Sequence, residues 1–235
     1  MMSLRWISTN SDVLSREASR DFLMQSNKQT IEAYRAKPVL IEEHVRQEAA
    51  IREGAYSRRQ IYELVQNSVD ALQGFEDGRI HVLLTDHALY CADNGSGLTN
   101  RGLMAVLNSY LSAKNDQEIG RYGLGFKSVL AVTDRPEIHT TGLSFRFDPE
   151  WAREEIRSVT GYSGETPVLR LARPISREEV LANDPHLAEL ASWASTIVKL
   201  PFKGKVPGWL DQDIANFPAE LLLFAPQIAE LTLEY

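Results

Sequence analysis

The chain is organised around one predicted helix, which contains the stretch Glu63-Leu64-Val65-Gln66-Asn67-Ser68-Val69-Asp70-Ala71. Glu63, Asn67 and Asp70 are spaced so that they share one narrow face of this helix. The opposite face is expected to pack on a sheet or core, and it carries Ile61, Leu64, Val65, Ser68 and Leu72. Taken alone, the polar stripe is more typical of an amphipathic surface helix whose polar side is solvated. Features elsewhere in the chain have to decide between these interpretations.

Signals at both ends bound this helix. Ser57 and Gln60 form a capping box before it, and Gly74 suits its C-terminal stop. Upstream, residues 11–24 and 30–36 are predicted as two helices, and Pro38 opens a third. We therefore expect residues 1–54 to form a helical N-terminal extension and residues 55–235 to form the main domain.

A predicted β-hairpin follows the helix, with strands at residues 79–84 and 88–92. Its second strand runs directly into Asp93-Asn94-Gly95-Ser96-Gly97-Leu98-Thr99. A carboxylate at a strand end, followed by two glycines, is an acid beside a backbone that a ligand can approach closely. The same cluster is also typical of a simple Asp-Asn-Gly turn, and both interpretations stay open at this point.

A glycine-rich turn opens a predicted apolar helix in the run Ile119-Gly120-Arg121-Tyr122-Gly123-Leu124-Gly125-Phe126-Lys127-Ser128-Val129. Such a turn offers backbone N–H groups and the positive end of the helix dipole to an anion, most often phosphate. It is not a P-loop, because Phe126 rather than glycine precedes Lys127. It is not a dinucleotide fingerprint either, because Ser128 stands where the third glycine is required, as Asn100 does after Gly97. Further along, residues 167–171 and 195–201 are predicted strands.

Together and in this order, the three motifs resemble those of the GHKL ATPase superfamily, most closely its chaperone and sacsin-like branch. The resemblance covers residues 57–140, with the strand at 195–201 as a continuation. It implies the Bergerat fold, an α+β, two-layer α/β sandwich. In that fold a mixed, mostly antiparallel sheet is covered by helices on one face, and ATP lies between the helices and the sheet.

The resemblance also implies roles for individual residues. Glu63 matches the catalytic general base that activates the attacking water, and Asn67 matches the Mg²⁺ ligand. Asp93 matches the carboxylate that accepts a hydrogen bond from the adenine amino group. Independently of the family, Glu63 and Asn67 lie one helical turn apart, roughly 6 Å, which suits a base and a metal ligand.

The remaining nucleotide contacts implied by the resemblance come from all three motifs and the later strand. They are Asp70, Ala71, Gly95, Gly97, Leu98, Lys114, Gly120, Arg121, Tyr122, Gly123, Leu124, Gly125, Phe126, Lys127 and Thr196. Lys114 is equally compatible with a solvated surface lysine. Gly123 and Gly125 are expected to hinge a lid over residues 98–119.

Composition limits the other options. The net charge of −7 and a pI near 5.3 do not indicate nucleic-acid or anionic-membrane binding. No apolar run approaches the length of a membrane span. The single cysteine, Cys91, excludes an internal disulfide and fits a cytoplasmic location. The five histidines show no metal-ligand spacing.

The expected function is Mg²⁺-dependent binding of ATP and its slow hydrolysis, because no residue is identifiable as the cation that stabilises the γ-phosphate. Hydrolysis would drive a lid or homodimerisation switch in a larger chaperone-like or defence-related protein, with downstream domains of the same chain as partners. A non-hydrolysing ATP sensor or scaffold is the first alternative. A histidine kinase catalytic domain is the second, disfavoured by Glu63 and by the lack of a phosphoacceptor helix.

Overall fold

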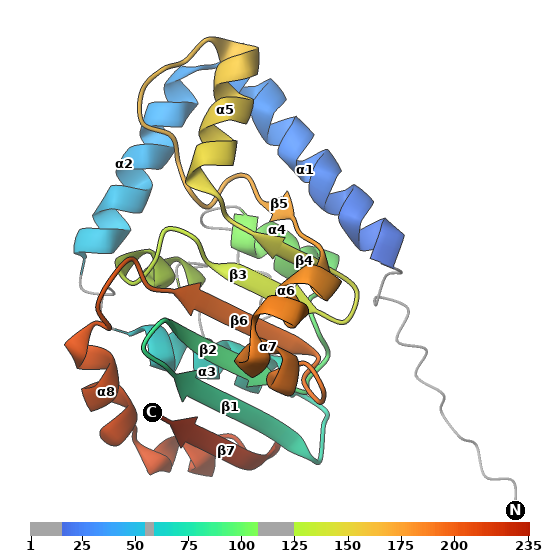
Figure 1. Ribbon diagram of the computed structural model, residues 1–235, viewed down its shortest axis with the longest axis vertical. Coiled ribbons are helices and arrows are strands. Elements are labelled where there is room, and N and C mark those ends of the chain that lie inside the picture. The colour runs from blue at the N-terminus through green and yellow to red at the C-terminus, as the bar shows by residue number, and fades with distance from the viewer. Residues whose placement is uncertain (1–15, 55–58, 108–124) are drawn as a thin grey trace, which may run out of the picture.

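The computed structural model describes residues 16–54, 59–107 and 125–235 (Figure 1). The strands are β1 (Gly78–Leu84), β2 (Ala88–Asp93), β3 (Glu137–Thr140), β4 (Ser144–Arg146), β5 (Arg173–Pro174), β6 (Thr196–Pro201) and β7 (Ile228–Glu234). The α-helices are α1 (Arg16–Ala36), α2 (Val39–Glu53), α3 (Gln60–Ala71), α4 (Asn100–Leu107), α5 (Pro149–Thr160), α6 (Arg177–Asn183), α7 (Pro185–Leu190) and α8 (Gly208–Ala215). Two 3₁₀ helices, η1 (Phe126–Ala131) and η2 (Ala219–Phe224), complete the described elements. In this part of the chain, no helix has both the length and the apolar character needed to cross a bilayer.

The strands form one mixed sheet in the order β5-β4-β3-β6-β2-β1-β7. Every neighbouring pair is antiparallel except β1 and β7, which run parallel. The predicted hairpin is the β1–β2 pair, and the predicted strand at 195–201 is β6, which pairs with β2. The predicted fold class, α+β with a mixed and mostly antiparallel sheet, is therefore confirmed.

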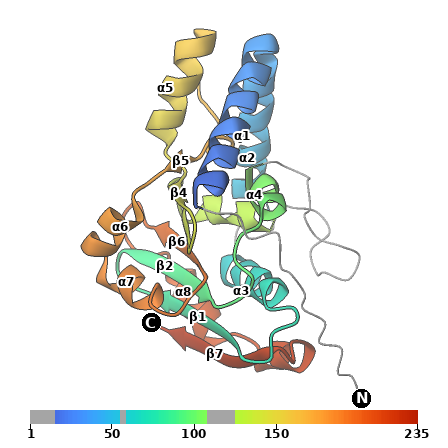
Figure 2. The same cartoon turned by 90° about the vertical axis from the view of Figure 1, so that its right-hand side faces the viewer.

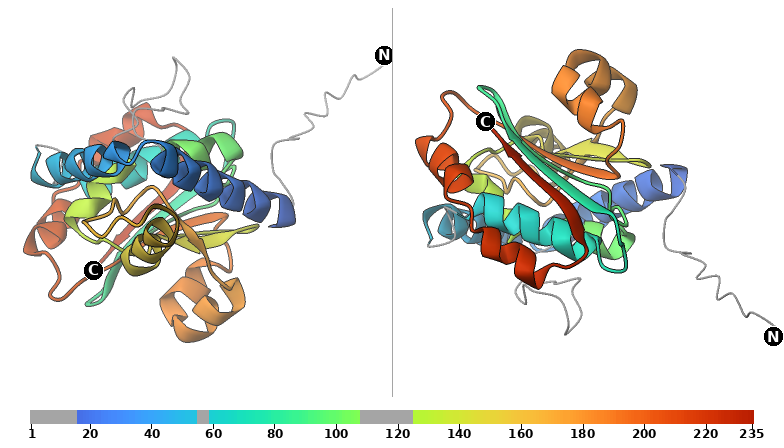
Figure 3. Two further views of the ribbon diagram at one scale, coloured as in Figure 1. Left: turned by 90° about the horizontal axis from the view of Figure 1, so that it is seen from above. Right: turned by 90° about the horizontal axis from the view of Figure 1, so that it is seen from below.

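The two faces of the sheet are distinguished by the alternation of side chains along β2. Leu89 and Cys91 face α3, η1 and α8, where the largest apolar cluster lies. Ala88, Tyr90 and Ala92 face the opposite side, where short helix α7 packs on them. Figure 2 and the right-hand view of Figure 3 show α3 on one side of the sheet and the α6–α7 pair on the other. Helices thus cover the α3 face most fully, and α6–α7 add a smaller second cover.

Helix α1 is one continuous helix, so the predicted break between residues 24 and 30 is wrong. Two polar residues of the intervening stretch, Ser26 and Asn27, are buried. Asn27 is buried, where its amide nitrogen donates to Ala172 O at 2.8 Å and its oxygen accepts from Ala172 N at 3.1 Å. Helices α1, α2 and α5 rise together at one end of the molecule around Tyr34, Ile41 and Ile156 (Figures 1 and 2).

The predicted strand at residues 167–171 is also wrong, because this segment forms a buried turn. The backbone N–H groups of Val168 and Leu169 donate to the Glu48 carboxylate on α2, at 2.7 and 2.9 Å. A side chain 120 residues away in sequence therefore supplies the acceptors that a neighbouring strand would otherwise provide. Glu48 is 3% exposed, and burial raises its pKa, although these two bonds and the charges of Lys127 and Arg170 oppose the shift.

We predict that replacing Glu48 with alanine destabilises the fold by about 3–5 kcal/mol, because two buried N–H groups and two buried cations lose their partner. Glu53→Ala, on the exposed side of the same helix, should change the free energy of unfolding by less than about 0.5 kcal/mol. Urea denaturation of both variants measures the difference. Equal stabilities for the two variants would contradict the role assigned to Glu48.

Candidate functional site

Helix α3 presents the predicted polar stripe beside the core. Its apolar side chains Ile61, Leu64 and Val65 are buried, as predicted. Glu63, Asn67 and Asp70 are each partly buried, and the Glu63 side chain is 13% exposed. The stripe is therefore not a fully solvated face. The helix begins at Gln60, and Ser57 of the predicted capping box lies outside the described residues.

The glycine-rich motif reaches this stripe at Gly125, immediately before η1. A methyl group built on the Gly125 backbone would collide with the Glu63 carboxylate, so a larger residue here would force that carboxylate to move. That carboxylate forms an ion pair with Arg59, whose Nε lies 4.0 Å from Glu63 Oε1. The predicted residues Lys114, Gly120, Arg121, Tyr122, Gly123 and Leu124 lie outside the described residues, as does most of the predicted lid.

Asp93 occupies the end of β2 on the face that carries Leu89 and Cys91, which is the α3 face. It is 4% exposed. Ser68 on α3 donates its hydroxyl to Asp93 Oδ2 at 3.1 Å, and Gly95 N donates to Oδ1 at 3.0 Å. Burial raises the pKa of Asp93 to about 6, although both hydrogen bonds act to lower it. A carboxylate with this pKa is still ionised at neutral pH and can accept further hydrogen bonds.

The turn after Asp93 is fastened to the C-terminal end of α3. Ser96 N donates to Ala71 O at 2.9 Å, and a Cβ on Gly95 would lie only 2.5 Å from that same oxygen. Gly95 is thus required by this contact with the helix. Gly97 adopts a φ of +77°, which favours glycine. The chain bends at Gly95 and Ser96 and holds Asp93 beside α3, which is compatible with both interpretations of the Asp-Asn-Gly cluster.

Thr196 lies directly opposite Asp93 in the antiparallel register of β2 and β6. Its hydroxyl oxygen is buried and has no hydrogen-bond partner within the described residues. The preceding Ser195 donates its hydroxyl to Gly95 O at 2.7 Å and its backbone N–H to Asp93 O at 2.8 Å. Two strands therefore bring a buried carboxylate and an unpartnered hydroxyl to adjacent positions.

Three other predicted site residues contact the protein interior. Lys127 is 1% exposed, and its Nζ donates to Val106 O at 3.3 Å at the end of α4. Burial lowers its pKa to about 8, helped by the charge of Arg170 and opposed by that of Glu48. Phe126 packs between two apolar clusters, and Leu98 packs against one of them.

Several residues that build the site were not predicted to belong to it. Ser68 was assigned to the apolar side of α3, yet it binds Asp93. Gln60 was predicted only as a capping residue, but its side chain donates to Ser128 O at 2.9 Å and joins α3 to η1. A serine or glutamine at a core position of an apolar helix face was the available signal, because a buried polar group needs a partner. Ser195 carried no comparable signal.

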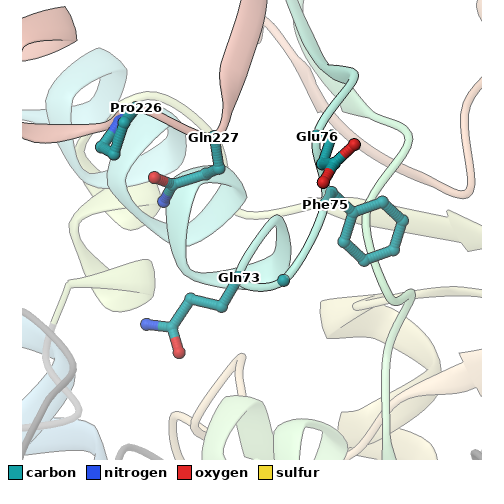
Figure 4. Close-up of a pocket in the computed structure, with 6 residues that line it drawn as sticks. Gln73, Phe75, Glu76, Pro226 and Gln227 are labelled. Carbon is teal, nitrogen blue, oxygen red and sulfur yellow. The ribbon is translucent and has the colours of Figure 1, made fainter. Parts of the chain in front are cut away.

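The described residues contain no cluster of three or more His, Cys, Asp or Glu side chains able to hold a metal ion. Asn67 offers an amide oxygen that has no protein partner among these residues. A pocket of about 520 Å³ opens where the turn after α3 meets the start of β7, lined by Phe75, Pro226 and Gln227 among others (Figure 4). It includes none of the predicted site residues, so it is separate from the arrangement around Asp93.

A comparison with curated proteins finds a partial match. No family model matches the chain. It is 34% identical over 91 residues to the Arabidopsis thaliana protein named NO VEIN. The aligned region covers 37% of this chain and 3% of the plant protein, so the chain corresponds to a small part of that relative's length.

Proposed function

We propose that this chain binds Mg²⁺·ATP between α3 and the sheet and hydrolyses it slowly. The observation that carries the proposal is the pairing of buried Asp93 with Thr196, whose hydroxyl oxygen is also buried. The pair lies beside α3, whose Glu63 contacts Gly125. Two motifs that are separated in sequence thus meet α3, which carries the first motif. Their order and residue types also resemble those of the GHKL ATPases.

The Asp93–Thr196 pair has the chemistry that selects adenine. Each carboxylate oxygen of Asp93 accepts one hydrogen bond from the protein and retains capacity for another. The Thr196 hydroxyl, unpartnered within the described chain, can donate to a ring nitrogen or accept from the amino group. An incoming adenine would therefore satisfy a polar atom that otherwise remains buried without a partner.

The residues present also fit a magnesium ion that is held mainly by phosphates and water. Magnesium commonly takes only one or two protein ligands, and Asn67 supplies a single amide oxygen. The bound ion would neutralise charge on the phosphates during transfer. Glu63, one turn before Asn67, would accept a proton from the attacking water, and Gly125 leaves room for its carboxylate.

The contacts of Lys127 support a slow rate. Phosphoryl transfer depends largely on positive charge around the γ-phosphate. Lys127 lies in the glycine-rich motif, but it is enclosed and donates to Val106 O. We infer that turnover stays weak until a cation arrives from another domain or chain. A fully non-hydrolysing ATP sensor is the alternative that the same pocket allows.

The proposed biological role is a cytoplasmic, ATP-controlled conformational switch, with or without homodimerisation, inside a larger chaperone-like or defence-related protein. The partial match to a much longer plant protein supports a modular role. The sacsin-like character of the glycine-rich motif supports the chaperone-like assignment.

We predict that Asp93→Asn abolishes measurable ATP binding, because the amide replaces an acceptor with a donor at one position. Wild-type affinity should fall as the pH drops through about 6, where Asp93 becomes protonated, and should be constant above about pH 7. Calorimetry with Mg²⁺·ATP at several pH values measures this. Asp86→Asn, in the exposed β1–β2 turn, is the control and should bind normally. Unchanged binding by Asp93→Asn would remove the adenine-site assignment.

The same substitution should stabilise the nucleotide-free protein at alkaline pH. The folded-state pKa of Asp93, about 6, lies above the ordinary value of 3.8. The Asp93 carboxyl therefore binds a proton more tightly in the folded protein than in the unfolded chain. Its contribution to the free energy of unfolding is fully present below about pH 4 and is lost as the pH rises through about 6. The asparagine that replaces this residue carries no charge, so between about pH 4 and pH 8 the variant should gain roughly 2 kcal/mol relative to wild type. Denaturation at both pH values tests this. A pH-independent difference would show that Asp93 is not buried as a charge.

We predict that Glu63→Gln lowers ATP hydrolysis by at least about 100-fold while leaving ATP affinity within about threefold, because a general base contributes to the chemical step rather than to binding. Glu76→Gln, exposed beyond the other end of α3, should hydrolyse normally. Phosphate release under single-turnover conditions measures the rates. Tight ATP binding without any Glu63-dependent turnover would instead support the sensor.

A further inference from the structure

The pocket of about 520 Å³ between the turn after α3 and the start of β7 lies apart from the proposed nucleotide site. Phe75 and Glu76 line it from the turn, and Pro226 and Gln227 line it from the segment between η2 and β7 (Figure 4). None of its lining residues has been assigned to the nucleotide site. Its volume falls in the range of binding pockets in proteins.

Hydrogen bonds fix both walls of this pocket. The side-chain amide of Gln227 donates to Val69 O on α3 at 3.1 Å, and Gly78 N donates to Gln227 O at 3.1 Å. On the other wall, Phe75 N donates to Leu72 O at 3.0 Å. The pocket is therefore formed in advance, so that a binding partner does not have to order its walls.

Exposed apolar side chains lie beside the pocket. Leu222, Leu223 and Phe224 are consecutive residues of η2, and all three are exposed, Leu223 and Phe224 by 78% and 79%. Phe224 is only two residues before Pro226, so the Cα atoms of these two residues lie within about 7 Å of each other. Phe75, in the lining itself, is also exposed. A run of large apolar side chains in water is unfavourable and is typical of an interaction surface.

The charged groups of the two wall segments are acidic. Residues 72–78 and 206–235, which include both walls, contain no Lys, Arg or His. Glu76 and Glu220 are exposed, and neither has a hydrogen-bond or ion-pair partner among the described residues. Arg79, the first cation after the turn, already forms an ion pair with a carboxylate of β7 at 3.4 Å. The apolar surface is therefore accompanied by negative charge that these segments leave uncompensated.

We propose that this pocket and η2 form a docking surface for a basic amphipathic segment of a partner protein. The apolar side chains of the segment would bind Phe75 and Phe224, and its Lys or Arg residues would lie near Glu76 and Glu220. Apolar anchors with charged groups at the rim are typical of protein interfaces. The same carboxylates disfavour an anionic lipid surface as the occupant. The proposal does not depend on the nucleotide site.

Fluorescence anisotropy with three labelled peptides tests the proposal. The first peptide consists of leucine and lysine, with the leucines at helical spacing on one face. In the second peptide glutamate replaces lysine, and in the third peptide serine replaces leucine. The leucine–lysine peptide should bind with a Kd of about 100 μM or tighter. Each of the other two should bind at least about tenfold more weakly, because one lacks the complementary charge and the other lacks the apolar side chains.

A double variant assigns the apolar part of the binding to this surface. Leu223→Ser/Phe224→Ser should weaken binding of the leucine–lysine peptide by at least about tenfold. Both side chains are largely exposed, so the substitutions should leave the fold intact. Val159→Ser, at an exposed position of α5, is the matched control and should bind as wild type does.

A second double variant tests the charge. Glu76→Gln/Glu220→Gln should weaken binding of the same peptide by about threefold or more at low salt and by less at high salt, because salt screens exposed charges. Glu154→Gln/Glu165→Gln removes two exposed carboxylates elsewhere on the chain and is the matched control.

Three results would overturn the proposal: no binding of the leucine–lysine peptide, equal binding of the leucine–glutamate peptide, or unchanged binding by Leu223→Ser/Phe224→Ser. Analytical ultracentrifugation and flotation with phosphatidylserine vesicles test the other occupants, and neither result should depend on Leu223 and Phe224. A dimer that this variant abolishes would assign the surface to a second copy instead, and vesicle binding that it abolishes would assign the surface to a membrane.

Discussion

The junction between α3 and the turn after β2 is the contact on which the rest of the site depends. Ala71 O, at the end of α3, accepts from Ser96 N and leaves no space for a side chain at Gly95. One turn earlier on the same helix, Ser68 binds Asp93. These contacts set where the helix lies along the sheet, and so determine which residues of α3 face Asp93 and which pack on the core.

This junction also explains why a carboxylate remains in an interior position. Two hydrogen bonds offset part of the cost of burying Asp93, but its pKa stays raised, so the charge is incompletely compensated. Thr196 beside it has a buried hydroxyl with no partner in the described chain. Two incompletely satisfied polar groups at paired positions are unfavourable for folding alone, and a ligand that binds both would relieve them together.

Local patterns in the sequence predicted the parts of the fold that local forces determine. The spacing of Leu64 and Val65 located the buried side of α3, and strand alternation located the β1–β2 hairpin and β6. The candidate site was predictable through Asp93 and Glu63, because each lies within a recognisable motif. The roles of Glu48 and Asn27 were not, because their partners lie more than a hundred residues away. Both wrong predictions of secondary structure lie at these contacts. The polar stretch of α1 around Asn27 resembled a break between helices, and the apolar turn that binds Glu48 resembled a strand.

The same distant contacts connect the N-terminal helices to the site. Lys127 donates to Val106 O and Arg170 donates to Leu107 O, both near the end of α4. The charges of both cations act on Glu48 of α2, which accepts from Val168 N. Cations at the C-terminal end of a helix are favourable, so this cluster holds α4, η1 and α2 as one unit. Gly125, which contacts Glu63, is only two residues before Lys127. Because α2 packs on η1, the N-terminal helices lie against the element that follows directly on the contact between Gly125 and Glu63.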